Sequence, residues 1–171
     1  MAVEIVTPPA EEPITLAQVK AHCRIDIDDD DALIASLIQD AREWCERYTR
    51  RALITQTWRL HIDAFPPSVG IHGGPLQLPG GKVQSVTTVA YTDTDGDAQT
   101  LDAADFQLSS KDPQRPAFIV PAYGTSWPST REVPDAVSVT YVTGYGDAAA
   151  VPQIFKSAML LHVGYYYSNR E

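Results

Sequence analysis

The sequence predicts an α+β fold in which a helical layer is interrupted by an antiparallel β-sheet insertion. Apolar residues recur at helical spacing in two N-terminal segments, within residues 16–50, and again in a C-terminal segment, residues 152–171. Between them, residues 56–143 alternate apolar and polar side chains with the period of two that strands require. A chain of 171 residues fits one domain, which can bury roughly 70% of its unfolded surface. We therefore expect a single domain spanning residues 1–171.

The first helix is predicted from a cap signal. Residues 1–14 are acidic and rich in proline, which predicts an extended arm that becomes ordered on contact with a partner. Thr15 and Gln18 have the spacing of a capping box, and Ile14 with Val19 can form a hydrophobic staple. A short helix over residues 16–23 is expected to follow.

The second helix carries the clearest periodicity in the chain. Asp28 to Asp31 offer an N-cap and carboxylates that interact favourably with the positive end of a helix dipole. The positions expected to pack inward are Leu33, Ile34, Leu37, Ile38, Ala41, Trp44, Cys45 and Tyr48. The positions expected to face solvent are Gln39, Asp40, Arg42, Glu43, Glu46 and Arg47.

The middle of the chain predicts strands. The first runs from residue 56 to Ile62, and Phe65 with two prolines ends it, after which residues 66–81 are expected to form a loop. Further strands are expected at residues 83–92, 99–101, 106–108, 117–120 and 136–143. The Asp95-Gly96 pair lies between the strands expected at residues 83–92 and 99–101, and it predicts a hairpin with a type I′ turn.

The last helix is predicted to begin at Pro152, which suits a first helical turn. It is apolar nearly all round from Ala158 to Tyr167. In a soluble monomer such a helix is central, so we expect it to pack on the second helix, with part of Tyr165-Tyr166-Tyr167 facing outward.

The charge balance excludes several classes of function. A formal charge of −9, from 13 basic and 22 acidic residues, disfavours tight binding to DNA phosphates but suits a passage through which DNA slides. The sequence encodes neither an export signal nor a membrane span, and its two cysteines, Cys23 and Cys45, lack the spacing of a disulfide framework or zinc site. We expect a reducing, cytosol-like environment and no membrane.

The sequence offers no catalytic or metal-binding pattern. Asp26, Asp28 and Asp30 alternate like the start of a calcium loop, but position six is Asp31 rather than glycine and position twelve is Leu37 rather than glutamate. The glycines near residues 73 and 80 are not followed by the lysine and serine of a phosphate-binding loop. The scattered histidines, His22, His61, His72 and His162, show no ligand spacing. We expect no catalytic residue, no metal and no cofactor.

The order of segments along nearly the whole chain resembles the bacteriophage head-tail connector, or adaptor, family. No single motif is diagnostic, and the resemblance depends on their collinear order. The matching segments are Pro13-Ile14-Thr15-Leu16-Ala17-Gln18-Val19-Lys20, Asp30-Asp31-Ala32-Leu33-Ile34 with Ala41-Arg42-Glu43, Ala52-Leu53-Ile54-Thr55-Gln56-Thr57-Trp58, Leu78-Pro79-Gly80-Gly81-Lys82-Val83-Gln84-Ser85-Val86, Thr140-Tyr141-Val142-Thr143-Gly144-Tyr145-Gly146, Val151-Pro152 and Tyr167-Ser168-Asn169-Arg170-Glu171.

The resemblance implies a ring of identical subunits, typically twelve, that docks beneath the portal protein and joins it to the stopper or tail-completion protein. Genomic DNA would pass through the ring without sequence-specific contact, and no catalysis is implied. Such a subunit is assembled in the bacterial host cytoplasm and resides in the virion neck. Asp28, Asp29, Asp30 and Asp31 are the acids expected to face the channel.

One departure from the family pattern concerns Arg50, where such chains usually carry glycine, so we expect the second helix to end differently here. The side chains predicted to contact neighbouring subunits or the portal are charged residues around this point and residues of the last helix. They are Arg42, Glu43, Arg47, Arg50, Arg51, Tyr165, Tyr166 and Arg170.

Two alternatives remain open at the level of sequence. A tail-completion or stopper protein of the same neck would share these features. A β-rich carbohydrate-binding module, from another class of function, would use Trp127 and Tyr123 as a sugar platform.

Overall fold

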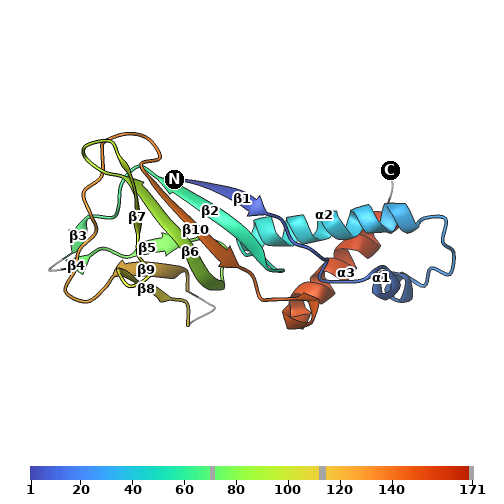
Figure 1. Ribbon diagram of the computed structural model, residues 1–171. Coiled ribbons are helices and arrows are strands. Elements are labelled where there is room, and N and C mark those ends of the chain that lie inside the picture. The colour runs from blue at the N-terminus through green and yellow to red at the C-terminus, as the bar shows by residue number, and fades with distance from the viewer. Residues whose placement is uncertain (70–71, 112–114, 170–171) are drawn as a thin grey trace. The chain divides into compact units, whose positions relative to one another are not determined.

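The computed structural model describes residues 1–69, 72–111 and 115–169, and the chain divides into two compact units (Figure 1). The β unit comprises residues 1–8 and 56–144, and the helical unit comprises residues 9–55 and 145–171. The helical unit is therefore built from two separate segments of the chain with most of the β unit between them, and residues 1–8 at the N-terminus belong to the β unit. This confirms the predicted α+β class.

The helical unit packs three helices around one apolar core (Figure 1). Its elements are α1 (Leu16–Cys23), α2 (Asp31–Thr49), a short 3₁₀ helix η1 (Ala148–Ala150) and α3 (Gln153–Ser168). The helix α3 packs on α2 and also on α1, as predicted for so apolar a helix. The buried core consists of Ile14, Val19, Ile34, Ile38, Ala41, Cys45, Leu53, Ile54, Val151, Met159 and Val163.

The helix starts follow the sequence signals in part. In the capping box of α1, the Gln18 amide donates to Thr15 Oγ1 at 3.2 Å and the Thr15 amide donates to Gln18 Oε1 at 2.8 Å. Asp30 occupies the N-cap of α2, but its carboxylate accepts a 2.6 Å hydrogen bond from the Tyr167 hydroxyl instead of capping the helix. Pro152 lies one residue before α3 rather than in its first turn. The Asp30 carboxylate thus connects the start of α2 to the end of α3.

Arg50 ends α2 in the left-handed conformation that glycine normally provides, with φ 54° and ψ 40°. Its backbone N–H donates to the Glu46 carbonyl, which closes the helix. The expectation that α2 ends differently without glycine is wrong, because the chain accepts the backbone strain of roughly 1 kcal/mol at a non-glycine residue. Arg24 ends α1 in the same way, with φ 55°.

The β unit contains a five-stranded antiparallel sheet in the order β1-β2-β10-β6-β7. A three-stranded sheet has the order β5-β9-β8, and β3 pairs with β4. The strands are β1 (Ala2–Thr7), β2 (Gln56–Ile62), β3 (Ser68–Val69), β4 (His72–Gly73), β5 (Leu76–Leu78), β6 (Val83–Thr92), β7 (Ala98–Leu101), β8 (Phe106–Ser109), β9 (Ala117–Pro121) and β10 (Val137–Thr143).

Two expectations about this unit need correction. Residues 2–7, expected to lie in a free arm, form strand β1 and pair with β2, because Val3, Ile5 and Val6 give them a strand-forming composition that the neighbouring prolines obscure. The segment 66–81, expected to be a loop, contains the short strands β3, β4 and β5. Short strands that pair with distant partners carry too weak a local signal to be read from the sequence.

Both larger sheets contribute to one core, and the strand alternation was predicted correctly. In β10, Val137, Val139 and Tyr141 are fully buried, whereas the residues between them are only half-buried. The Tyr141 hydroxyl donates a 3.0 Å hydrogen bond to the Pro79 carbonyl, which satisfies its polar atom within the core. The buried core consists of Leu60, Ile62, Phe65, Leu76, Leu78, Val83, Val89, Ala117, Ile119, Val137, Val139 and Tyr141.

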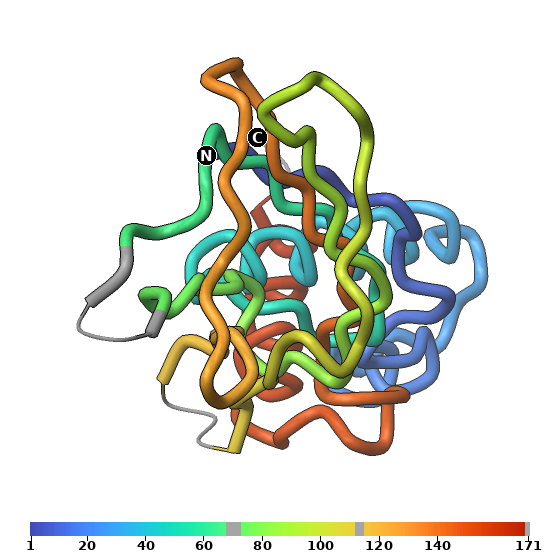
Figure 2. The backbone as a smooth tube through the Cα atoms, turned by 60° about the vertical axis from the view of Figure 1, so that its left-hand side comes forward, coloured from blue at the N-terminus to red at the C-terminus, as the bar shows by residue number. Residues whose placement is uncertain are grey.

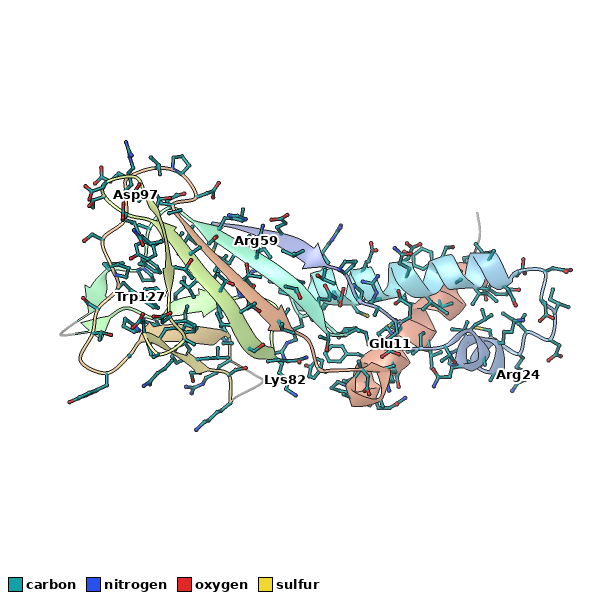
Figure 3. The ribbon with its side chains drawn as sticks, in the orientation of Figure 1. Glu11, Arg24, Arg59, Lys82, Asp97 and Trp127 are labelled. Atoms are coloured by element: carbon teal, nitrogen blue, oxygen red, sulfur yellow. The ribbon has the colours of Figure 1, made fainter. Side chains whose placement is uncertain are left out.

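The predicted hairpin joins β6 and β7 (Figures 2 and 3), but its turn is held by a side chain and is not of the expected type I′. The Asp93 carboxylate accepts hydrogen bonds from the backbone amides of Asp95, Gly96 and Asp97 at 3.1, 3.0 and 2.9 Å. Gly96 has a positive φ of 100° and Asp95 does not, so the turn is not type I′. The Gln99 amide and these backbone amides hold the pKa of the Asp93 carboxyl below its ordinary value.

Candidate functional site

Arg42 lies at the centre of a charged cluster inside the helical unit. Its Nε donates to Glu12 Oε2 at 2.8 Å and its Nη1 donates to Glu46 Oε2 at 3.0 Å, with Glu43 at 3.7 Å. Burial lowers the pKa of the guanidinium, but Glu12 and Glu46 more than reverse this, so the pKa lies above its ordinary value. Arg42 was expected on the solvent face and is instead buried, because Glu12 reaches it from the segment before α1.

Arg51 and Glu46 hold the segment that follows α2. Glu46 Oε1 accepts from the Leu53 amide at 2.8 Å, and Arg51 Nη1 donates to the Tyr145 hydroxyl at 3.3 Å. The Tyr145 amide in turn donates to the Leu53 carbonyl at 3.1 Å. Residues 51–55 are thereby fixed to residues 145–146 within the helical unit.

The other predicted interface charges lie on the surface. Glu43, Arg47 and Arg50 are exposed on the last turns of α2 and at its C-cap, and Glu43 accepts a 3.0 Å hydrogen bond from the Gln39 amide. Arg170 lies outside the described residues. The exposed predicted charges of α2 are therefore Glu43, Arg47 and Arg50, while Arg42 and Arg51 serve the fold of their own unit.

Two of the four predicted channel acids contact Lys20. Lys20 Nζ lies 2.5 Å from both Asp28 Oδ1 and Asp31 Oδ1, and thereby ties the loop after α1 to the first turn of α2. Hydrogen bonds to Asp28 and Asp31 raise the pKa of Lys20, and Lys20 lowers the pKa of Asp28. Asp29 is exposed, and Asp30 binds the Tyr167 hydroxyl. One lysine among four carboxylates leaves this corner of the unit acidic.

Five aromatic rings form a continuous row over the surface of α2 and α3, which we call the aromatic ladder. Tyr48 stacks on Trp44 with ring centroids 5.2 Å apart, and Trp44 lies 5.2 Å from His162. His162 lies 4.7 Å from Tyr166, which meets Tyr165 edge-on at 5.4 Å. The side chains are nevertheless open to solvent: Tyr48 is 77% exposed, Tyr165 65% and Trp44 50%.

The aromatic ladder has its own electrostatic character. Burial lowers the pKa of the His162 imidazole, and the charge of Asp40 partly opposes this, so the ring is neutral near neutral pH. Leu161, also strongly exposed, adds an aliphatic side chain on α3. The ladder is therefore an uncharged apolar surface.

Strand β1 forms a second exposed apolar surface, which we call the β1 edge. It is an outer strand of the five-stranded sheet, and all six of its residues are exposed. Val3 pairs with Leu60 and Ile5 with Trp58, so these side chains lie on the face of the sheet that carries the core. Leu60 is fully buried, but Val3 is 42% and Ile5 55% exposed.

The opposite face of the β1 edge is polar. Glu4 Oε2 lies 3.6 Å from Arg59 Nη1 and 3.5 Å from His61 Nε2 on the neighbouring strand. Arg59 also donates to Thr140 Oγ1 at 3.3 Å, and Figure 3 shows it beside β1. These contacts fix β1 to the sheet and leave Val3 and Ile5 without a covering layer of their own.

Trp127, predicted as a sugar platform in the carbohydrate-binding alternative, is partly buried and packs against the core of the β unit (Figure 3). Its indole stacks on Phe65 with centroids 4.7 Å apart, and its Nε1 donates to the Gly74 carbonyl at 2.8 Å. A Cβ at Gly73 would lie 2.4 Å from the indole, so only glycine fits beneath it. Phe65 thus occupies one face of the Trp127 indole, and this contact weakens the carbohydrate-binding alternative.

The chemistry of the thiols matches a structural role. Burial raises the pKa of both Cys23 and Cys45, which keeps them as thiols and lowers their nucleophilicity. Within residues 1–69, 72–111 and 115–169, no three His, Cys, Asp or Glu side chains gather closely enough to hold a metal ion. Among the helices of this described part, none combines the length and apolar character needed to cross a membrane.

Comparison with known families assigns the chain. A family model described as phage gp6-like head-tail connector protein matches residues 13–109, which is more than half of the chain. The chain belongs to this family. It is a structural protein of the neck, where the head of a phage-like particle meets its tail.

Solved structures with the same fold come from gene transfer agent (GTA) particles. A chain of the virion of a native GTA particle is 25% identical with a TM-score of 0.82, and a chain of the neck of an empty particle, computed with C6 symmetry, is 26% identical with a TM-score of 0.80. Both comparisons cover 100% of the connector and 86% of the other chain.

A third chain, from the neck of a native GTA particle computed with C12 symmetry, shares the fold at 24% identity and a TM-score of 0.77, over 100% of the connector and 85% of that chain. No curated protein sequence matches the connector.

Sequence reasoning about the connector found Tyr165 and Tyr166 but missed the rest of the exposed apolar surface. Trp44 and Tyr48 were assigned to the packed face of α2, and Val3 and Ile5 to an arm. One signal was available, because eight apolar positions make a broad stripe on α2, and in the fold Trp44 and Tyr48 of this stripe are left uncovered. These two aromatic side chains are the part of the stripe that the helical unit leaves exposed.

Proposed function

We propose that the connector forms a ring of identical copies, twelve in the virion, that docks beneath the portal protein and joins it to the stopper or tail-completion protein. The observation that carries this proposal is the match of residues 13–109 to the head-tail connector family, joined to a full-length fold likeness with neck chains. The necks of an empty and a native GTA particle, which contain similar chains, were computed with C6 and C12 symmetry, and this supports a cyclic arrangement. We infer no catalytic step.

The distribution of exposed side chains supports an assembly role. The aromatic ladder and the β1 edge are ordered apolar surfaces, and the described part of the chain also exposes large apolar side chains elsewhere, such as Ile27, Tyr123 and Ile154. Contiguous apolar patches of this kind mark protein interfaces. We assign Glu43, Arg47 and Arg50 to the polar rim of contacts with neighbouring copies or the portal.

We further propose that the acidic corner around Lys20 faces the DNA channel. Asp28, Asp29, Asp30 and Asp31 outnumber Lys20, and a surplus of carboxylates repels phosphate. A wall of this sign lets DNA pass without adhering to it. Replacing Asp29 by lysine in every copy is expected to slow DNA exit from particles, with normal neck assembly.

The test is electron microscopy of particles produced with and without the connector gene. The expected result is a density ring between portal and stopper that disappears with the gene, leaving heads that cannot retain a tail. Complementation with the wild-type gene is the control. Heads that join tails normally without the gene would contradict the proposal, and density one layer further from the head would make this chain a stopper instead.

A further inference from the structure

The aromatic ladder and the β1 edge differ in kind, and a ring needs two different surfaces per subunit. A closed ring is built from heterologous contacts, in which one patch of a subunit meets another patch of the next. The aromatic ladder lies in the helical unit and the β1 edge in the β unit. Each is made of ordered secondary structure.

We propose that the aromatic ladder of one connector copy packs against the β1 edge of the next copy in the ring. This rests on the proposed function, since it names the partner surface on which that ring depends. The occupant of each surface is thus a second copy of this chain. Tyr48, Trp44 and Tyr165 are the anchors of one side, and Val3 and Ile5 those of the other.

The shapes of the two surfaces are compatible. Side chains on one face of a strand, such as Val3 and Ile5, repeat about every 7 Å. The rings of Trp44 and Tyr48, at positions i and i+4 of α2, have centroids 5.2 Å apart. Branched aliphatic side chains can therefore rest on successive rings, which buries the core face of β1 and the ladder together.

The aromatic ladder is organised before any partner arrives. Its five rings already contact one another, so they lose little side-chain freedom when they become buried. Tyrosine and tryptophan in such positions carry much of the binding energy of protein interfaces. The neutral form of His162 places no charge in the middle of the row.

Other occupants fit less well. Nucleic acid stacks on aromatic rings only where a basic groove holds its backbone, and α2 surrounds Trp44 with Asp40 and Glu43 as well as Arg47. A pairing of two ladders, or of two β1 edges, would be isologous and would stop at a dimer. Pairing of the ladder with the β1 edge is the combination that allows a ring to close.

The first test uses two variants that each lose one surface. Tyr48→Lys with Tyr165→Lys disables the ladder, and Val3→Lys with Ile5→Lys disables the β1 edge. Each variant alone is expected to associate at least about tenfold more weakly than wild type. Their mixture is expected to give a heterodimer and nothing larger, because one intact surface of each kind remains.

Matched controls separate surface loss from general effects of charge. Tyr123→Lys alters a tyrosine that is 90% exposed outside both surfaces, and Thr100→Lys alters the opposite edge strand, β7. Both are expected to associate like wild type. Circular dichroism checks that each variant is folded. Under conditions in which the wild-type connector associates, a mixture that stays monomeric, or a single variant that still dimerises, would overturn the proposal.

The second test works on assembled necks, and so applies even if the free connector is monomeric. A photo-crosslinking phenylalanine analogue at position 48, with position 123 as control, is activated in purified particles. Mass spectrometry is expected to find residues 2–7 of another connector copy at position 48. Crosslinks to the portal, to another connector segment or to nothing would overturn the pairing. Particles without any connector in the neck would instead refute the proposed function.

Discussion

The β unit and the helical unit follow the same hydrophobic rule with different results. In strand β10 of the β unit, each residue that alternation sends inward is buried. In helix α2 of the helical unit, Ile34 and Ile38 are buried as periodicity requires, but Trp44 and Tyr48 lie open on the same broad stripe. Apolar periodicity therefore indicates which side chains of a segment need to be buried. It does not indicate whether the same chain or a partner covers them.

The charges show a complementary difference. In the helical unit the buried Arg42 ties α2 to the segment before α1, and Glu46 ties α2 to Leu53 in the segment after it, while the aromatic ladder lies outside. The β unit buries its apolar residues and places the contacts of Glu4, Arg59 and His61 on a sheet face. Because the charges of the Arg42 cluster are paired within the helical unit, we expect the aromatic rings to provide most of the affinity of this unit for other subunits.

The largest effect is expected from comparing one tyrosine in each unit. Tyr141→Ala removes a fully buried ring and is expected to cost about 4 kcal/mol of unfolding free energy. Tyr48→Ala removes an exposed ring and should cost less than about 1 kcal/mol. Urea unfolding measures both. A large loss of stability for Tyr48→Ala would show that the ladder belongs to the core of its own unit.

The control for the buried position is Tyr141→Phe, which keeps the ring and loses the hydrogen bond to the Pro79 carbonyl. It should cost about 1–2 kcal/mol, since the carbonyl is left without that donor. Trp58 and Trp127 lie in the β unit and Trp44 in the helical unit, so tryptophan substitutions allow each unit to be followed separately.

The next effect concerns the Arg42 cluster. Arg42→Ala leaves Glu12 and Glu46 close together without their cation, and is expected to cost about 2 kcal/mol, a value reduced because Glu12 is partly open to solvent. Arg42→Lys keeps the charge but cannot reach both carboxylates in the same way, so it should lose about half as much. If Arg42→Ala unfolds at the same urea concentration as wild type, the cluster does not hold the helical unit together.

Much of the fold could be predicted, because its signals are local. The capping box at Thr15, the α2 stripe and the β10 alternation each act within a few residues. Strand β1 could not be predicted with the same ease, since its pairing with β2 joins residues far apart in the chain. The burial of Arg42 depends likewise on Glu12, thirty positions away.

The candidate surfaces were predictable only in part. Tyr165 and Tyr166 stand out because α3 is apolar all round. The ladder as a whole depends on α2 and α3 lying side by side, which brings Trp44 within 5.2 Å of His162. No spacing in the sequence encodes that neighbourhood, so sequence reasoning identified Tyr165 and Tyr166 but neither the other members of the ladder nor their arrangement.

A smaller effect is expected at the end of α2. Arg50→Gly relieves the left-handed strain but adds freedom to the unfolded chain, so it should stabilise the protein by about 0.5 kcal/mol. Arg47→Gly, inside the last turn, is the matched control and should destabilise by about 1 kcal/mol. Opposite signs at positions three residues apart would confirm that Arg50 carries strain. Thermal unfolding of the two variants measures this, and destabilisation by Arg50→Gly would contradict it.

The smallest effect is expected at the turn of the β6–β7 hairpin. It tests whether this turn is held by the Asp93 side chain or by the pairing of the two strands. The Gln99 amide and three backbone amides hold the pKa of Asp93 below its ordinary value, so the ionised form is favoured in the fold. The resulting stabilisation is complete above the ordinary pKa of aspartate and is lost as pH falls through the lower folded value. The protection factors of the Gly96 and Asp97 amides, taken relative to their intrinsic exchange rates at each pH, are therefore expected to fall in acid before the sheet opens. Asp93→Asn should remove this pH dependence, while Asp95→Asn, which keeps the Asp93 carboxylate, should retain it. Equal acid sensitivity in both variants would mean that the turn is held by its strands, as the rest of the β unit is, and not by its own side chain.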